Sequence, residues 1–539
     1  MTARLLLGDE AIAEGAMDSA IKGAFSYPGT PATEIFETIQ HAAESRGISA
    51  KWSANEKVAY EEALGMSYAG GRALVSMKHV GLNVAADPFV NSALTGVNAG
   101  LVLVVADDPG MHSSQNEQDS RFYADFAHLP LFEPATQQEA YDMTRKAFEY
   151  SEAIGLPVVV RTVTRLSHSR ANVVTAQASH EHADAARAML RPSPTPGDWT
   201  LVPSTARKRF AKLVQAQPRL LEDSERDPAN RLTLAGRVGV IAAGIAHNYV
   251  QEALRGSGNL SVLKIAHYPL PVSLIRELVD HCDEILVAED GYPFIERRLN
   301  GLLGLPGKAI RGRLTGALPA TGELTPDILA RALGRDVAPA VDPLDDLAAR
   351  PPQLCRGCPH SDSFRAIVEA TAGYENPLLF SDIGCYTLGV MPPYRAVHAC
   401  VDMGASIAMA HGAAQAGAHP VICTIGDSTF SHSGMTPLLG AAHSNADMTV
   451  FVLDNATTAM TGTQESLGSG ERLLEILRGL GVHPDHLHVI DPLPRQHAGN
   501  VDLIKREIEY HGLSVIVPTR ACIHVNRKHR EIGAVPALA

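Results

Sequence analysis

The chain has 539 residues and a mass of 57.4 kDa, which predicts three or four domains. Hydrophobic residues make up 45% and charged residues 19%, so disorder is excluded as the dominant state. The 59 acidic and 46 basic residues give a net charge of −13, which argues against nucleic acid or an anionic membrane as the main partner. No apolar run reaches the roughly 18 residues of a spanning helix, and the acids after the first leucines are atypical of a signal peptide. We therefore expect a cytoplasmic protein.

The first segment, residues 1–170, alternates short apolar strands with amphipathic helices. Strands are predicted near residues 24–27, 73–77, 101–106 and 156–163, with an Ala- and Glu-rich helix over 54–70. Unbroken runs of Val, Leu and Ile are typical of strands that are buried on both faces of a parallel sheet. Residues 171–230 are then predicted to be a polar linker, because the proline-rich stretch 192–199 cannot form regular structure.

Two further α/β segments follow the linker. Strands near 236–244, 261–265 and 284–288 define a smaller unit over residues 231–334, and a Pro- and Asp-rich linker over 335–353 comes next. The third unit spans 354–525, with strands near 377–381, 421–425, 449–453 and 513–517, and residues 526–539 form a short tail. The pattern predicts three doubly wound α/β domains in one chain.

The most specific motif joins the ends of two neighbouring predicted strands. GDSTF begins at Gly426, LDN ends at Asn455, and 26 residues lie between Ser428 and Asn455. Parallel strands would present the Asp427 carboxylate and the Asn455 amide together at their carboxyl ends, where ligands bind in such sheets. Oxygen ligands of this kind suit Mg²⁺. Taken singly, Asp427 could instead cap a helix and Asn455 could sit in a turn. The paired spacing favours a metal–diphosphate site.

This segment resembles the diphosphate-binding motif of thiamine diphosphate enzymes, with Ser428 in the place of a glycine. Other strings are YPGTP at Tyr27, NEKVAYEEALG at Asn55, MKHVGLNVAADP at Met77, CRGCPH at Cys355, DIGCYTLG at Asp382 and TTAMTG at Thr457. Together they resemble the alpha subunit of indolepyruvate ferredoxin oxidoreductases over nearly the whole chain. The resemblance implies a pyrimidine-binding domain over 1–170, a transketolase C-terminal-like domain over 231–334 and a diphosphate-binding domain over 354–525.

The resemblance also implies the cofactor contacts. Mg²⁺ would be held by Asp427, Asn455 and the backbone carbonyl of Thr457, and Gly404, Gly426 and Ser428 would line the cofactor. Glu56 would be the acid beside the aminopyrimidine, although the residues alone do not distinguish it from neighbouring helix glutamates. Met403 would prop the cofactor into its bent shape, or it is an ordinary core methionine.

Substrate contacts are implied less directly. Thr30, in YPGTP, resembles the threonine that meets the substrate carboxylate, but it can also be a plain turn residue. His79, in MKHVG, follows a strand and would face the same crevice. His483, His486 and His488 are interpreted as surface residues, because their spacing is not an HExxH pattern and no acidic residue lies at ligand spacing.

Four cysteines resemble the ligands of a cluster close to the cofactor. Cys355 and Cys358 form a CxxC, Cys385 follows a strand, and Cys522 follows the last strand. By resemblance they hold one [4Fe–4S] cluster, since soft thiolates suit iron–sulfur sites. A zinc site that uses Cys355, Cys358 and His360 with another cysteine, and four unconnected cysteines, are the alternatives.

The family usually continues into a ferredoxin-like tail, and this chain ends soon after Cys522 without the CxxCxxCxxxC runs of that tail.

The resemblance also implies the reaction, which is oxidative decarboxylation of aryl-2-oxoacids to acyl-CoA and CO₂. Electrons would leave through the cluster to ferredoxin or to a partner subunit. A homodimer of this chain with a smaller beta subunit, in a heterotetramer, is expected. A non-oxidative thiamine diphosphate-dependent decarboxylase or carboligase is the alternative, and a non-catalytic scaffold subunit is a third interpretation.

Overall fold

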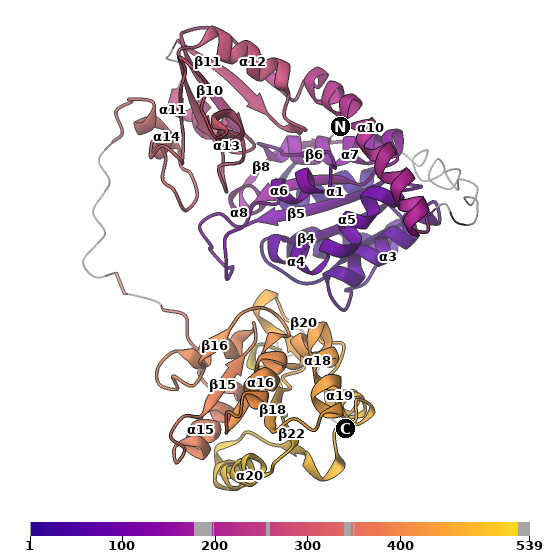
Figure 1. Ribbon diagram of the computed structural model, residues 1–539, viewed down its shortest axis with the longest axis vertical. Helices are drawn as coiled ribbons and strands as arrows, with labels where there is room; N and C mark the ends of the chain where they lie inside the picture. Colours follow the sequence, from indigo (N-terminus) through magenta and orange to yellow (C-terminus); the bar gives the residue numbers. More distant parts are fainter. Residues whose placement is uncertain are drawn as a thin grey trace. The chain divides into compact units, whose positions relative to one another are not determined.

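A computed structural model describes residues 2–176, 197, 199–254, 259–338, 347–348 and 351–525. The chain divides into two compact units, Met1–Val341 and Asp342–Ala539 (Figure 1). The division falls in the segment that the sequence predicts to be the second linker. Each unit is built on parallel sheets with helices on both faces, as the sequence predicts. Among the described residues, no helix combines the length and the apolar character that crossing a membrane requires.

The first sheet of unit 1 has seven strands in the order β12-β6-β7-β5-β4-β2-β3. All pairs are parallel except β12 with β6. Every residue of β5 is buried, which is why its sequence does not alternate. The strands are β2 (Gly23–Ser26), β3 (Ser49–Ala50), β4 (Ala73–Lys78), β5 (Leu101–Asp107), β6 (Leu131–Phe132), β7 (Val158–Val163) and β12 (His267–Tyr268).

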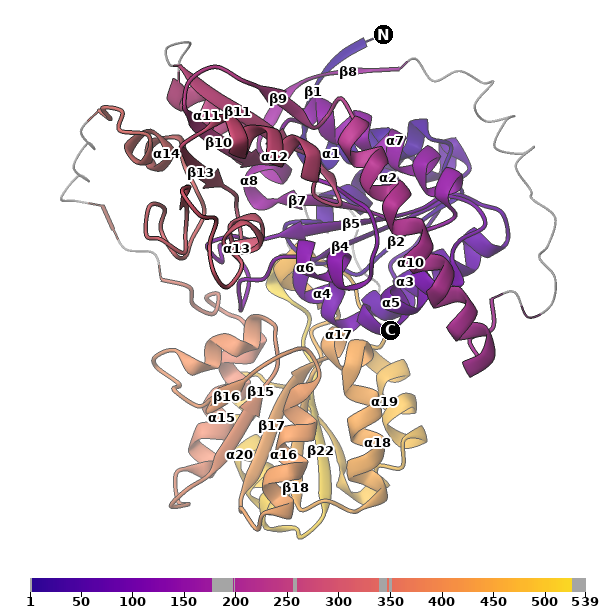
Figure 2. The same ribbon diagram turned by 45° about the horizontal axis from the view of Figure 1, so that its top comes forward.

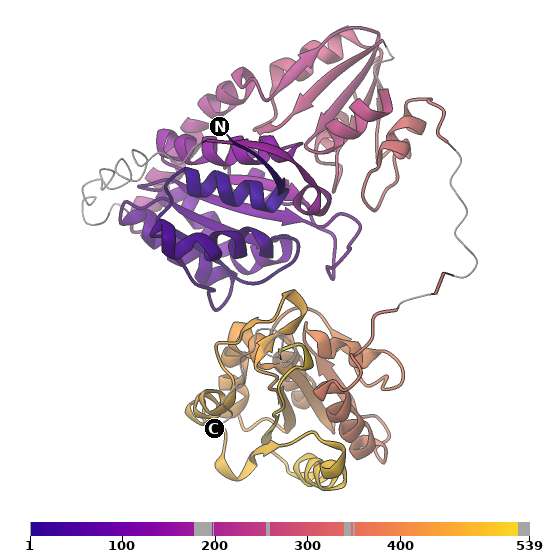
Figure 3. The ribbon, with the colours of Figure 1, turned by 180° about the vertical axis from the view of Figure 1, so that it is seen from behind.

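Each face of this sheet packs against its own set of helices. Side chains such as Val75 and Leu103 contact a core that includes residues of α3 (Glu56–Tyr68) and α5 (Ala86–Thr95). Leu74 and Val104, which point to the other face, contact α1 (Gly8–Asp18), α2 (Thr33–Arg46) and α7 (Gln137–Ile154). Figure 3 shows the indigo α1 on that second face. Alternate strand residues therefore serve two separate cores.

The second sheet of unit 1 has five strands in the order β14-β13-β10-β11-β9. Helix α11 (Ala246–Leu254) contributes Ala246, Tyr249 and Val250 to the core on one of its faces. The other face joins the same core as α3 and α5, through residues such as Ile241 and Leu263. The strands are β9 (Arg231–Thr233), β10 (Val238–Ala243), β11 (Leu260–Ile265), β13 (Glu284–Ala288) and β14 (Ala309–Arg311).

A buried ionic network also joins the two sheets of unit 1. The Arg161 guanidinium contacts Asp107 at 2.7 Å and donates to the backbone carbonyl of Asp290 at 2.9 Å. Arg121 pairs with Glu289 at 2.8 Å. Both arginines are at most 1% exposed, so removing one partner would leave an uncompensated buried charge. Shared core and shared charges explain why the first two predicted domains form one compact unit.

The prediction of a polar linker over 171–230 is wrong in part. Strand β8 (Arg170–Thr175) pairs antiparallel with β1 (Thr2–Leu7), and α10 (Pro203–Arg226) is a helix of 24 residues (Figure 2). The helix is polar on average, buries only Leu213, Leu220 and Ser224, and contains Pro218, a residue type that normally interrupts helices, so its sequence resembles a linker. The stretch 192–199 lies almost entirely outside the described residues.

Unit 2 contains one six-stranded parallel sheet in the order β16-β15-β17-β18-β22-β21. One face packs on α16 (Ala405–Gln415), α18 (Met435–His443) and α19 (Gly470–Gly479), and the other on α15 (Pro359–Thr371) and α20 (His497–Glu509). The strands are β15 (Leu378–Ser381), β16 (Ala399–Cys400), β17 (Val421–Gly426), β18 (Met448–Leu453), β21 (Leu487–Ile490) and β22 (Leu513–Pro518). The predicted tail 526–539 lies outside the described residues.

Candidate active site

Asp427 and Asn455 follow two strands that are direct neighbours in the sheet of unit 2. Strand β17 ends at Gly426, which pairs with Leu453 at the end of β18. A short helix, α17 (Asp427–Thr429), begins at Asp427 and continues through a π-helical turn into α18. Such turns are frequent at functional sites. The two predicted ligands therefore share the carboxyl edge of the sheet, where α/β proteins bind ligands.

The Asp427 carboxyl is one of the buried acids at this edge. It is 2% exposed, and its Oδ2 atom is buried without a hydrogen-bond partner among the described residues. Burial, and then the nearby charge of Asp454, raise the pKa of Asp427 to about 7. A divalent cation would favour the ionised form and supply the missing partner. The chemistry of this oxygen therefore fits a Mg²⁺ ligand.

Asn455 is held by three contacts. Its Oδ1 accepts the backbone N–H of Thr457 at 3.1 Å, which leaves one lone pair free. Its Nδ2 lies 3.1 Å from Nε2 of His360, which is 3% exposed. Its backbone carbonyl accepts the N–H of Cys522 at 3.1 Å. Together these contacts to the side chain and the backbone hold the amide oxygen of Asn455 in one orientation.

Two glycines at the same edge allow neighbouring side chains to approach the backbone closely. A Cβ on Gly426 would meet the ring of Tyr386 at 2.7 Å, and a Cβ on Gly404 would meet Ser433 at 2.5 Å. Gly404 also has φ +96°, a backbone conformation that favours glycine. Its N–H donates to Asp382 at 2.5 Å, which fixes the loop before α16. Burial raises the pKa of Asp382 to about 6.

The other predicted contacts of unit 2 lie on the loops of this edge. Met403 precedes Gly404 and is half-buried. The hydroxyls of Ser428 and Thr458 are 2.7 Å apart, and Thr457 is buried with its hydroxyl donating to the Gln464 carbonyl at 2.8 Å. The sequence does not single out Asp454. The Asp454 carboxylate accepts hydrogen bonds from the backbone N–H groups of Ala456 and Gly470. The only sequence feature that points to Asp454 is its position in LDN, next to Asn455.

In unit 1, Glu56 is the first residue of α3 and is 4% exposed. Asn55 caps this helix, since its side chain accepts the N–H of Val58 at 2.9 Å. The Glu56 side chain lies over Gly81, where an added Cβ would approach its Cγ to 2.6 Å. Burial distinguishes Glu56 from Glu61, whose side chain is 45% exposed. A buried, positioned carboxyl is suited to moving a proton.

Lys78 is a site residue that sequence reasoning missed. It ends β4, its stem packs against Gly29 of YPGTP, and it lies close enough to Asp108 and Glu56 to interact with their charges. Burial lowers the pKa of Lys78, and the two acids partly oppose this. The signal was its place beside His79 in MKHVG, at the end of a predicted strand.

Thr30 and His79 lie at the carboxyl edge of the same sheet. Thr30 is half-buried, and its carbonyl is 3.4 Å from the Ser113 hydroxyl. His79 begins α4 (His79–Val84), is 1% exposed, and its Nε2 lies 3.1 Å from the Asn116 backbone and side-chain oxygens. Thr30, Lys78 and Glu56 therefore belong to one unit, and Asp427 and Asn455 to the other.

The four predicted cluster cysteines are neighbours in unit 2. Burial raises the pKa of Cys385 to about 12, and the charges of Cys358, Cys522 and Cys355 add to the rise. Burial also raises the pKa of Cys358, again with contributions from Cys355 and Cys522. Sγ of Cys355 lies 3.4 Å from Nε2 of His524. Residues separated by more than a hundred positions in sequence therefore converge near the Asn455 edge.

The interpretation of His483, His486 and His488 as surface residues is wrong for His486 and His488, and all three have an acidic residue nearby. Glu507, on α20, contacts both His486 and His488 and is only 2% exposed on its side chain. No local spacing reveals this pair, because the acid comes from a helix about twenty residues further along the chain. His483 remains mostly exposed.

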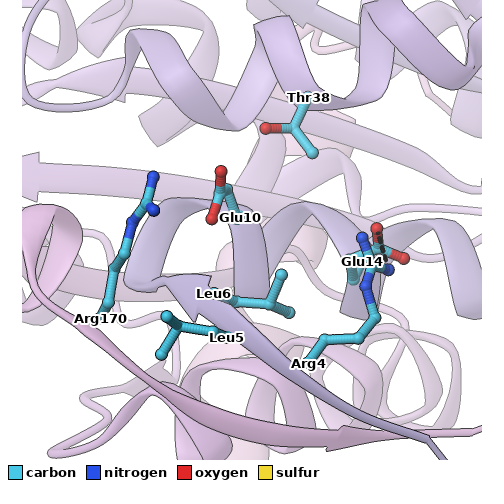
Figure 4. Close-up of a pocket in the computed structure, with 7 residues that line it drawn as sticks. All are labelled: Arg4, Leu5, Leu6, Glu10, Glu14, Thr38 and Arg170. Carbon is cyan, nitrogen blue, oxygen red and sulfur yellow. Dashed lines mark ion pairs between the residues drawn. The ribbon is translucent and has the colours of Figure 1, made fainter.

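A surface pocket of about 370 Å³ lies between β1, α1 and α2, and none of the predicted site residues lines it. Figure 4 shows Arg4 and Glu14 joined in an ion pair of 2.6 Å there, while Thr38 and Arg170 lie further along its wall. Because the charges around this pocket are paired, it has little net charge to attract a charged substrate. We therefore do not assign it to the active site.

Comparison with known proteins finds a family match in each of the two units. Residues 14–203 match the thiamine diphosphate-binding family of pyruvate flavodoxin/ferredoxin oxidoreductases. Residues 382–490 match the C-terminal thiamine pyrophosphate-binding domain of thiamine pyrophosphate enzymes. A solved 2-oxoglutarate:ferredoxin oxidoreductase from Magnetococcus marinus shares the fold, with a TM-score of 0.50 and 15% identity over 62% of this chain and 65% of that chain.

Curated relatives extend over nearly the whole chain. The indolepyruvate oxidoreductase subunit IorA of Archaeoglobus fulgidus is 38% identical over 98% of this chain and 88% of its own length. The corresponding subunit of Methanothermobacter thermautotrophicus is 39% identical over 96% of this chain and 86% of its own length. Fold, site and matches define a thiamine diphosphate-dependent 2-oxoacid oxidoreductase. More narrowly, the chain belongs to the family of the indolepyruvate oxidoreductase subunit IorA. The resemblance found in the sequence is thereby confirmed.

Proposed function

We propose that this chain catalyses the oxidative decarboxylation of aryl-2-oxoacids, of the indolepyruvate type, to acyl-CoA and CO₂. One [4Fe–4S] cluster would carry the electrons to ferredoxin or to a partner subunit. The observation that carries the proposal is the contact between the Cys522 N–H and the Asn455 carbonyl, because it joins the cysteine group to the proposed metal ligand. The names of the relatives support the substrate class.

Asp427, Asn455 and the Thr457 carbonyl are the residues proposed to hold Mg²⁺. The buried Oδ2 of Asp427, which has no hydrogen-bond partner in the described part of the chain, and the spare lone pair of Asn455 Oδ1 suit a hard cation. Gly404, Gly426, Ser428 and Met403 would line the cofactor. The thiazolium of bound thiamine diphosphate supplies an electron sink for decarboxylation.

Glu56 is proposed to donate a hydrogen bond to, and exchange a proton with, the aminopyrimidine ring nitrogen. Its burial at the start of α3 supports that role. Thr30 would bind the substrate carboxylate, and His79 would face the substrate from the end of β4. Lys78, held between Asp108 and Glu56, would add positive charge next to the YPGTP turn. A cation there suits an anionic 2-oxoacid.

Cys355, Cys358, Cys385 and Cys522 are proposed to bind the [4Fe–4S] cluster. A single tetrahedral Zn²⁺ with four thiolates would bring the sulfurs to about 3.8 Å from one another. Among the described residues, the potential ligand groups whose donor atoms all lie within 4.8 Å of one another include none of these cysteines. His360 is engaged with Asn455 through Nε2, which also speaks against the zinc alternative.

A smaller beta subunit and a homodimer of this chain within a heterotetramer are proposed as the assembly. The curated relatives are named as subunits, which supports a partner chain. Ferredoxin and coenzyme A would then be the electron acceptor and the acyl acceptor. The non-oxidative decarboxylase or carboligase alternative is disfavoured because the relatives are oxidoreductases. The scaffold alternative is disfavoured by the intact set of Glu56, Asp427 and Asn455.

Iron, labile sulfide and product measurements on anaerobically purified protein test the proposal. We expect about four irons per chain, and acyl-CoA from indolepyruvate when partner and acceptor are present. Cys385→Ser should lose the cluster and acyl-CoA formation together, whereas Cys282→Ser, at a buried cysteine away from the group, should keep both. Iron-free protein that releases an aldehyde would establish the decarboxylase alternative instead.

A further inference from the structure

Two histidines and a buried glutamate meet at the edge of the sheet in unit 2. Nδ1 of His486 lies 2.9 Å from Oε2 of Glu507, and Nε2 of His488 lies 2.8 Å from Oε1 of the same carboxylate. The side chains of His486, His488 and Glu507 are 22%, 23% and 2% exposed. The three donor atoms all lie within 4.8 Å of one another.

The local backbone explains why the two imidazoles converge. His486 ends a 3₁₀ turn (Pro484–His486) and His488 is the second residue of β21, so the two are separated by one residue. In extended chain, residues two apart point to the same side. Glu507 comes from the last turn of α20 and reaches both rings. The Tyr510 ring stacks on the His486 imidazole with centroids 3.5 Å apart, which restricts its rotation.

The contact between His488 and Glu507 is close but is not an aligned hydrogen bond. Nε2 of His488 is buried and donates no hydrogen bond among the described residues, although Oε1 of Glu507 is 2.8 Å away. A cation shared by the two atoms would satisfy the buried nitrogen, which no aligned hydrogen bond satisfies among the described residues. Two imidazoles and one carboxylate are the donor set of three-ligand zinc sites that keep a fourth position open.

We propose that His486, His488 and Glu507 bind one Zn²⁺ ion, with a water molecule or another small ligand in the fourth position. The ion would fasten the edge strand β21 to the end of α20. Strand β21 starts next to the site and runs parallel to β22, toward the edge that carries Cys522 and Asn455. The zinc site therefore lies at the opposite end of the strands from the proposed cofactor, and its role is independent of the proposed reaction.

A second His-rich group offers a matched control. His419, Asp447 and His511 also bring their donor atoms within 4.8 Å, but both histidines are more accessible, with side chains 32% and 78% exposed. The His419 and Asp447 atoms are 3.6 Å apart. An exposed group of this kind gains less from a bound ion, because water already solvates its charges.

The test measures Zn²⁺ binding to the full chain, purified without metal and prepared anaerobically with its cysteines in the same state in every variant. His488→Asn should bind one Zn²⁺ per chain fewer than the wild type, and His511→Asn should bind the same number as the wild type. Saturating Zn²⁺ should raise the Tm of wild type and His511→Asn more than that of His488→Asn. Any zinc on the cysteines cancels in the difference.

Folding controls keep the result interpretable. Circular dichroism and thiamine diphosphate binding should be the same in all variants, and His486→Asn replaces His488→Asn if the latter is misfolded. Bound Co²⁺ should show d–d bands whose loss follows His488→Asn without loss of a thiolate charge-transfer band. Equal zinc stoichiometry in wild type and both folded histidine variants would overturn the proposal and leave Glu507 as a paired buried acid.

Discussion

Asn455 donates a hydrogen bond from Nδ2 to Nε2 of the buried His360, at 3.1 Å. An amide nitrogen only donates, so Nε2 accepts and His360 must carry its proton on Nδ1. Burial lowers the pKa of His360 to about 4, which keeps the ring neutral under ordinary conditions. His360 is thereby a positioning residue for the Asn455 amide, of the kind that orients ligands around metal sites.

Replacing His360 should loosen the proposed metal site. His360→Leu removes the acceptor, and we expect Mg²⁺-dependent affinity for thiamine diphosphate to fall by about 10- to 100-fold. His360→Gln, which retains an acceptor oxygen, should recover part of the loss. Titration calorimetry of thiamine diphosphate at fixed Mg²⁺ measures this. His443→Gln, on the exposed end of α18, is the control, and equal affinity in His360→Leu would contradict the positioning role.

Asp427→Ala should abolish retention of the cofactor. The variant removes the charged oxygen that would balance Mg²⁺ and the diphosphate, so binding loses its main electrostatic contact. Thiamine diphosphate content after purification and gel filtration is the measurement. Asp402→Ala, an exposed acid two residues before Gly404, should retain it. Full cofactor occupancy in Asp427→Ala would refute the assignment.

Glu56→Gln should leave cofactor binding nearly intact and slow hydrogen exchange at C2 of bound thiamine diphosphate by about 10²- to 10⁴-fold. A glutamine can accept or donate a hydrogen bond but cannot exchange a proton with the ring nitrogen. Quenched-flow H/D exchange followed by NMR measures the rate. Glu61→Gln, in the same helix but half-exposed, should exchange at the wild-type rate. An unchanged rate in Glu56→Gln would exclude this carboxyl as the proton-transfer group.

Stability should fall in mild acid partly because of His247, in α11. Burial, and then the charge of Lys264, lower the pKa of His247 from 6.5 to about 4. As the pH falls, His247 in the unfolded chain therefore takes up a proton before His247 in the folded protein does. The contribution of His247 to stability is fully present above pH 6.5 and is lost as the pH falls toward 4. His247→Gln should flatten the decline of Tm between pH 6.5 and pH 4. His41→Gln, on the exposed face of α2, should leave the slope unchanged, and an unaltered slope in His247→Gln would contradict the assignment.

The sequence by itself determined the family, the sheet-forming segments and the edge that carries Asp427 and Asn455. Apolar runs that are buried on both faces, such as β5 and β18, predict strands because no solvent side interrupts them with polar residues. GDS and LDN follow those strands directly. Asp427 and Asn455 lie at the same edge because β17 and β18 are neighbouring parallel strands.

Only the tertiary structure decided contacts between residues far apart in the chain. Helix α10 is predominantly polar and contains Pro218, so its sequence resembles a linker although the segment folds as one helix. His360 meets Asn455, and Glu507 meets His486 and His488, across loops and helices whose packing no local pattern encodes. Local periodicity reports which side of an element is buried, whereas the identity of the partner on that side depends on how the elements pack.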